Sequence, residues 1–87
     1  MEERLGFIGV VMEERRSAAL VNEAIGAFAH LVRARIGVPD AQSDSAVIGL
    51  IVQGNDRDLG ALTARLGNLR GVQVKSALVK SKDKGEL

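Results

Sequence analysis

The sequence predicts an α+β fold, a ferredoxin-like sandwich in which an antiparallel four-stranded sheet carries two helices on one face, in the order β-α-β-β-α-β. Two stretches, 5–12 and 45–54, are apolar on both of the faces that alternate along a strand, as central strands are. Two others, 33–38 and 72–79, carry polar residues or run into a proline, as edge strands do. Amphipathic helices connect the strands within each half. This topology satisfies all four strand positions at once.

The two central strands define the expected core and leave one face of the sheet bare. In the stretch 45–54, one face carries Ala46, Ile48, Leu50 and Val52, and the other carries Val47, Gly49 and Ile51. The first strand repeats the pattern with Gly6, Ile8, Val10 and Met12 against Leu5, Phe7, Gly9 and Val11. Because both helices must cover the same face, the other stays apolar and in water, which usually marks an interface. We therefore expect a homo-oligomer, a dimer or a tetramer; the alternative is that the bare patch is small.

Each helix shows one apolar side and a capping residue. We expect the first helix to start at Ser17 and to bury one side, made of Leu20, Val21, Ala24, Ile25, Phe28, Leu31 and Val32. The second follows the capping residue Asn55, ends at Gly71, and buries Leu59, Leu62, Leu66 and Leu69. This spacing places four leucines on one side of the second helix.

Composition limits the classes of function. The 87 residues suit one domain, which we place at 1–80, with a charged tail at 81–87 that we expect to be disordered. The net charge is +1 and acids alternate with bases, which argues against direct contact with nucleic acid or a membrane. The absence of cysteine removes disulfides and thiolate chemistry. With neither a secretory signal nor a long apolar run, the expected location is the cytoplasm.

Two segments, 34–39 (ARIGVP) and 60–75 (GALTARLGNLRGVQVK), resemble the family of iron-only hydrogenase system regulators. The resemblance extends over about 5–79, and departs where the family often has Gly-Lys for Ala64-Arg65 and Gly for Ala34. These regulators are similar to the ACT domain and to the C-terminal domain of the nickel-responsive repressor. The resemblance therefore implies an oligomeric ACT-like regulatory domain. The repressor's metal site uses several histidines and a cysteine, whereas this chain has only His30, which we expect to face solvent; we expect no metal and no cofactor.

The resemblance also implies a place for a small effector. ACT domains often hold one, commonly an amino acid, where the turn after the first strand and the start of the first helix meet a neighbouring subunit. Here Arg15 and Arg16 in that turn are candidates to hold a carboxylate, the alternative being a solvated charged turn. Arg35 and Gly37 in the second strand are the other two candidates, with the Arg35 guanidinium suited to holding a carboxylate or phosphate. Arg35 is equally suited to pairing with an acid of an adjacent subunit. Asn22 is expected on the outer side of the first helix.

Small residues form a second stripe on the second helix. Gly60, Thr63, Ala64 and Gly67 lie beside its leucines, and glycine within a helix costs about 1 kcal/mol relative to alanine. The stripe predicts close approach by another helix, either the first helix or one from a neighbouring chain. The alternative is that Gly60 lies in the first turn and Gly67 near the helix end, where the cost is smaller.

The sequence shows no recognisable set of catalytic residues, because no nucleophile or acid lies at a spacing that would pair it with the single histidine. RNA binding on the sheet needs aromatic side chains, and the two central strands offer only Phe7. We therefore expect a protein that is not an enzyme. Two functions remain: an effector-sensing regulator that acts through oligomerisation and a partner, or a structural interaction module without a small-molecule ligand.

Overall fold

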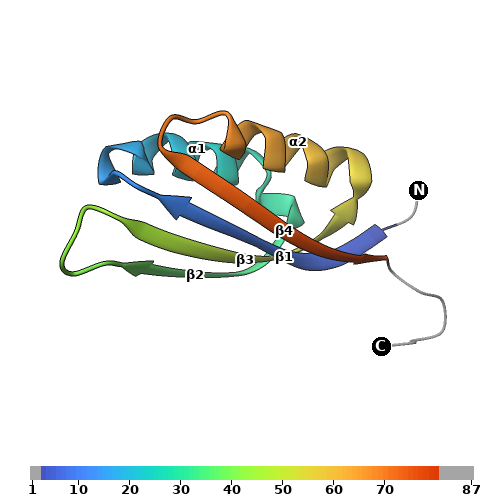
Figure 1. The fold of residues 1–87 in the computed structure, drawn as a ribbon. Helices are drawn as coiled ribbons and strands as arrows, with labels where there is room; N and C mark the ends of the chain where they lie inside the picture. The colour runs from blue at the N-terminus through green and yellow to red at the C-terminus, as the bar shows by residue number, and fades with distance from the viewer. Residues whose placement is uncertain (1–2, 81–87) are drawn as a thin grey trace.

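A computed structural model describes residues 3–80 of the chain and shows two helices packed on one face of a four-stranded antiparallel sheet (Figure 1). The predicted disordered tail, 81–87, lies outside the described residues. In chain order the elements are β1 (Glu3–Met12), the 3-10 turn η1 (Arg15–Ser17), α1 (Ala18–Ala27), the 3-10 turn η2 (Ala29–Leu31), β2 (Val32–Pro39), β3 (Ala46–Asn55), α2 (Asp56–Gly67) and β4 (Val72–Lys80).

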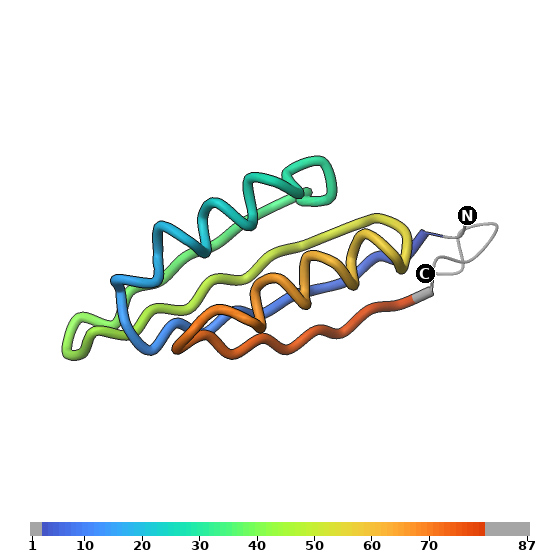
Figure 2. The backbone as a smooth tube through the Cα atoms, turned by 90° about the horizontal axis from the view of Figure 1, so that it is seen from above, coloured from blue at the N-terminus to red at the C-terminus, as the bar shows by residue number. Residues whose placement is uncertain are grey.

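The strand order is β2-β3-β1-β4, with every neighbouring pair antiparallel. The ferredoxin-like α+β class, the two central strands and the two edge strands are thus as predicted. Seen from above, α1 lies toward β2, and α2 lies toward β4 (Figure 2). The helices therefore divide one face of the sheet between them, and neither covers the other face.

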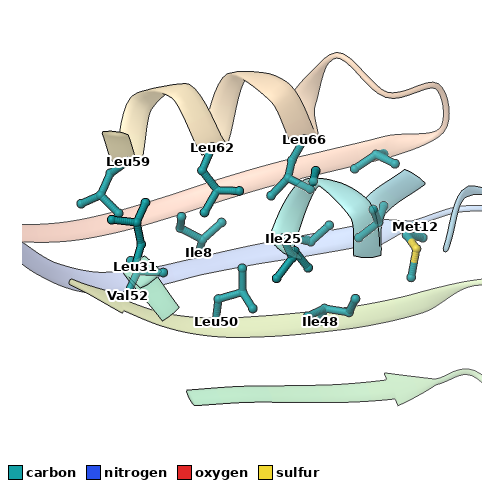
Figure 3. Packing of buried hydrophobic residues seen from close by; sticks show 14 residues of the cluster. Ile8, Met12, Ile25, Leu31, Ile48, Leu50, Val52, Leu59, Leu62 and Leu66 are labelled. Atoms are coloured by element: carbon teal, nitrogen blue, oxygen red, sulfur yellow. The ribbon is translucent and has the colours of Figure 1, made fainter. Parts of the chain in front are cut away.

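The core fills the space between the sheet and the two helices (Figure 3). Each central strand contributes alternate side chains, so that Ile8 and Leu50 are fully buried while their chain neighbours point away. Helix α2 adds three leucines at helical spacing, and α1 adds Val21, Ala24 and Ile25. The largest fully buried side chains are those of Ile8, Leu50, Leu59, Leu62, Leu66, Val10, Val21 and Val52. At about 25 cal/mol per Å² of apolar area, this burial is the main favourable contribution to folding.

The first helix differs from its prediction at both ends. The chain makes η1 before α1 begins, and Ser17 does not cap the helix; its hydroxyl instead donates to the carbonyl of Arg70 at 3.1 Å. Leu20, which was expected in the core, is 54% exposed. The helix stops at Ala27 because Phe28 leaves helical dihedral angles, and η2 then carries Leu31 into the core at 3% exposure. A tight turn, not a continuous helix, buries this leucine.

The second helix starts as predicted and ends earlier. The side chain of Asn55 accepts the backbone N–H of Asp58 at 2.8 Å, which caps the helix. Helix α2 ends at Gly67, four residues before the predicted end. Gly71 instead adopts a positive φ of 72° in the loop before β4, a conformation that favours glycine. Leu69 therefore packs against the core from this loop and not from the helix.

Candidate functional site

The helix-free side of the sheet, which we call the open face, exposes large apolar side chains from all four strands. Ile36 on the edge strand β2 is 71% exposed, and Phe7 near the middle of the sheet is 45% exposed. The exposed large side chains of the open face are Phe7, Val11, Ile36, Val38, Val47, Ile51 and Val79. Contiguous apolar surface of this kind is uncommon on a protein that stays monomeric.

The strand registers arrange the open face in rows that run across the sheet. We name two of them by their central residues. In the order β2, β3, β1, β4, the phenylalanine row is Ala34, Ile51, Phe7 and Ala77, and the glycine row is Ile36, Gly49, Gly9 and Lys75. The next row is Val38, Val47, Val11 and Gln73. Small residues thus stand at the edges of the phenylalanine row and in the centre of the glycine row.

The ring of Phe7 leans from its own row over the two glycines. A β-carbon built on Gly49 would lie 2.8 Å from Phe7 Cε1, and one built on Gly9 would lie 3.2 Å from Phe7 Cε2. The glycine pair therefore provides the space that the ring occupies. Beside the ring, toward β2, lies a groove of about 290 Å³, lined by Phe7, Ala34, Arg35, Ile36, Val38, Val47, Gly49 and Ile51.

Polar side chains border the open face at both ends of the central strands. At one end Arg33 Nε donates to Gln53 Oε1 at 3.3 Å, and Gln53 Nε2 donates to Glu3 Oε1 at 3.2 Å. At the other end Gln73 Nε2 donates to Glu13 Oε2 at 3.0 Å. An apolar centre with a hydrogen-bonded polar border is the usual anatomy of a protein interface.

The two arginines of the predicted effector turn lie apart and already have partners. Arg15 holds the loop between β2 and β3: its Nη2 donates to the carbonyl of Asp40 at 2.6 Å, and its backbone N–H donates to Asp44 Oδ2 at 3.2 Å. The Asp40 carboxylate accepts hydrogen bonds from the backbone N–H of Gln42 and from the Ser43 hydroxyl, and these lower its pKa below the ordinary value. The Gln42 bond has the larger effect, and the charge of Arg15 adds a smaller one. This arrangement orders the loop.

Arg16 lies in a different place, a hollow between the start of α1 and the loop before β4. Its Nη2 is 3.1 Å from Glu14 Oε2, in an ion pair that is largely exposed. The hollow has a volume of about 300 Å³ and is lined by Glu14, Arg16, Ser17, Leu20, Leu69 and Arg70. Two arginines, an exposed leucine and one glutamate thus line the same concave surface.

Arg35 and Gly37 lie on β2, away from this hollow. Their register opposite Leu50 and Ile48 directs them to the helix-covered side of the sheet. There Arg35 Nη2 donates to Asn22 Oδ1, which ties the edge strand to α1. Asn22 is exposed on α1, as predicted. The four predicted effector residues are therefore not gathered into one pocket within a single copy of the chain.

The small-residue stripe of α2 faces outward. A β-carbon at Gly60 or Gly67 would meet nothing within 4 Å, so α1 does not make the close approach that was one of its explanations. Ala64 is exposed, and Thr63, half-buried, donates its hydroxyl to the carbonyl of Leu59 at 2.7 Å. The prediction that Gly60, Thr63, Ala64 and Gly67 contact a neighbouring chain stays a prediction.

His30 is exposed in η2, as expected. Within 3–80, no three His, Cys, Asp or Glu side chains come close enough together to hold a metal ion. None of the helices in this range has the length and apolarity needed to cross a bilayer.

Sequence reasoning missed the pairing of Phe7 with Gly9 and Gly49, and the polar border. Alternation identifies which residues share a face, but the contacts depend on the register between strands. Two glycines at outward positions of adjacent central strands, Gly9 and Gly49, were the signal that was available.

A known protein family matches most of this chain. The model of the TM1266-like family, described as "Iron-only hydrogenase system regulator, putative", matches residues 4–76. The structure of protein TM1266 from Thermotoga maritima is 31% identical, with a TM-score of 0.86, over 91% of this chain and 100% of that one. Among curated proteins, none matches the chain.

More distant structures share the fold alone. The C-terminal domain of MgtC from Mycobacterium tuberculosis is 15% identical, with a TM-score of 0.66, over 92% of this chain and 89% of that one. CPII, a nitrogen regulatory PII-like protein from Thiomonas intermedia K12, is 13% identical, with a TM-score of 0.57, over 90% of this chain and 91% of that one.

Proposed function

Because the chain belongs to the TM1266-like family of iron-only hydrogenase system regulators, we propose that it is a regulatory ACT-like domain that works by self-assembly. In this proposal the open face is the surface that joins copies of the chain, and the assembled form acts on a protein partner without catalysing a reaction. The family description supports the regulatory role, and the surface of the sheet supports the assembly.

The observation that carries the proposal is the exposure of the open face. Seven large apolar side chains on it are at least 38% exposed in the single chain. Ile36 and Val38, at 71% and 61%, are the most exposed of them. Leaving such side chains in water gives up about 25 cal/mol per Å² of apolar area, which contact with another apolar surface recovers. The polar border at each end of the face limits the contact to its centre.

A small effector, such as an amino acid, fits the hollow at Arg16 better than the other predicted positions. Arg16 and Arg70 offer guanidinium groups for a carboxylate, and Leu20 offers apolar surface for the rest of the molecule. Arg15 and Arg35 are less suited because each is committed to a contact within the chain. Glu14 opposes an anion, and the ligand must displace its ion pair with Arg16.

The second candidate function is an interaction module without an effector. The partners of Arg15, Arg16 and Arg35 favour it, since each of these guanidinium groups already makes a hydrogen bond or an ion pair. In this case the three arginines are structural. They fix the β2–β3 loop, the η1 turn and the edge strand, and the open face remains the functional surface.

A thermal-shift screen of the full chain separates the two candidates. Amino acids, nucleotides and divalent metal ions are added one at a time, and a ligand at a hundred times its dissociation constant stabilises the folded state by about 2.7 kcal/mol. For an effector in the hollow, Arg16→Gln abolishes the shift, while Arg57→Gln on the exposed side of α2 keeps it. Absence of a shift with every compound contradicts effector sensing and favours the interaction module.

A further inference from the structure

We propose that two copies of the chain pack open face to open face about a two-fold axis that runs across the strands, so that Ile36 of each copy lies over Ala34 of the other. This inference rests on the self-assembly in the proposed function and specifies its geometry. The occupant of the open face is thus a second copy of the same chain. The axis passes between the phenylalanine row and the glycine row.

The pattern of large and small side chains along the two rows supports this arrangement. The phenylalanine row has alanines at its edges and large side chains at its centre, whereas the glycine row has long side chains at its edges and glycines at its centre. An axis between them places each row over the other row of the second copy. A high position then meets a low position at the β2 edge, where Ile36 lies over Ala34. The space over Gly9 and Gly49 is already occupied by the Phe7 ring of the same copy. The same surface serves both copies, as a two-fold interface requires.

The groove beside Phe7 is the receiving site in this geometry. Its lining includes the small residue Ala34, together with Phe7, Val47 and Ile51. Ile36, the most exposed large apolar side chain of the open face, fills the corresponding groove of the second copy. The two Phe7 rings meet near the axis, where aromatic pairs gain from offset stacking.

The alternative two-fold axis, which runs along the strands, matches this pattern poorly. It places each row over the same row of the second copy, so that Phe7 faces Ile51 and the alanine edges face each other across a gap. It also places Ile36 over Lys75, so that two long side chains meet at the same edge. With the axis across the strands, Lys75 stays at the β4 margin of the sheet, where its amine can extend past the edge strand into water.

The extent of the face agrees with a dimer. Four strands at about 4.8 Å spacing and four rows at about 6.8 Å cover about 500 Å² on each copy, before the relief of the side chains is counted. Two copies together bury about 1,000 Å² of flat area, which reaches the lower range of specific interfaces. The carboxylates of Glu3 and Glu13 lie at the ends of this area, outside the apolar centre.

Exchanging the large and the small residue on β2 tests the geometry. Ala34→Ile fills the position that receives Ile36, and we expect the dissociation constant of the dimer to rise at least about tenfold. The double variant Ala34→Ile with Ile36→Ala moves the protrusion to the other row and restores the match, so its dissociation constant returns toward that of the wild type. Both positions are exposed on an edge strand, so we expect both variants to fold. Circular dichroism and thermal unfolding check this.

Cross-linking provides the second readout. The chain has no cysteine, so single-cysteine variants can be mixed and treated with a short bismaleimide. We expect Ala34→Cys to link to Ile36→Cys, and not to Ala77→Cys. A link between positions 34 and 77, or a double variant as weak as Ala34→Ile alone, overturns this arrangement and leaves self-assembly standing. A wild-type chain that is monomeric at micromolar concentration overturns both.

Discussion

The ring of Phe7 on β1 lies against Gly49 on β3, so closely that a β-carbon at position 49 would come within 2.8 Å of the ring. Gly9, opposite Gly49 in the register, supplies the rest of the space. The glycine pair thus leaves the space that the Phe7 ring occupies on the open face, on the opposite side of the sheet from the buried core. This separation allows the open face to be altered while the fold is kept.

Gly49→Ala is expected to displace the Phe7 ring and to weaken self-association by about 1–3 kcal/mol, the usual cost of overpacking. The far side of the strand, with Ile48 and Leu50, is untouched, so the chain still folds. Sedimentation over a concentration series measures the effect. Gly37→Ala is the matched control, since its β-carbon would lie 3.9 Å from Ile48, an ordinary contact. Equal association of the two variants would show that the ring position does not matter.

Leu62→Ala is expected to destabilise the fold by about 2–5 kcal/mol, because Leu62 is fully buried between α2 and the sheet. Leu20→Ala, on α1, should cost about 1 kcal/mol or less, since Leu20 is 54% exposed. Urea unfolding at one fixed protein concentration compares them, because association itself adds to the measured stability. Similar losses for the two leucines would contradict the burial described for α1.

Asp40 is expected to titrate below its ordinary range because Gln42 and Ser43 donate hydrogen bonds to its carboxylate, with a contribution from Arg15. A pKa that is lower in the folded state stabilises the fold above the unfolded-state value of 3.8, and this contribution disappears as the pH falls through the folded-state pKa. Carboxyl-carbon NMR on wild type and Ser43→Ala measures it. The variant should titrate at higher pH; an unchanged titration would remove the Ser43 hydroxyl as a cause.

Gly67→Leu tests the small-residue stripe of α2. The space beside Gly67 is open in the single chain, so a leucine there should be tolerated by the fold. If the stripe contacts a neighbouring chain, as the sequence predicts, the variant forms a smaller assembly and elutes later than wild type in size-exclusion chromatography. Gly26→Ala on α1, where space is also open, serves as the control. An unchanged assembly of normal stability would assign the stripe no role in assembly.

The sheet was predictable because a period of two residues is a local property of the chain. Alternation alone separated Ile8 and Leu50 from Phe7 and Ile51 on opposite faces of their strands. Because both faces are apolar, it did not show which pair belongs to the core; the structure buries Ile8 and Leu50. Polar residues and Pro39 separated the edge strands from the central ones. The family resemblance rested on two short segments, and the family match over 4–76 confirms it.

The candidate site was less predictable because its contacts join residues that are distant in the sequence. Arg15 reaches Asp40, and Arg35 reaches Asn22, through hydrogen bonds that depend on loop geometry and on how α1 lies over β2. Ser17 looked like a helix cap, yet an extra 3-10 turn placed its hydroxyl on Arg70. Helical periodicity likewise put Leu20 in the core, although it is 54% exposed on α1.

Sedimentation equilibrium of the wild-type chain and of Ile51→Asp, both at micromolar concentration, tests the central claim most directly. Ile51 is 42% exposed on the open face, so the aspartate leaves the core intact but places a charge in the proposed contact. The proposed assembly predicts a mass that is a multiple of 9.2 kDa for the wild type and 9.2 kDa for the variant. A wild-type mass of 9.2 kDa, or the same multiple for both proteins, would contradict it.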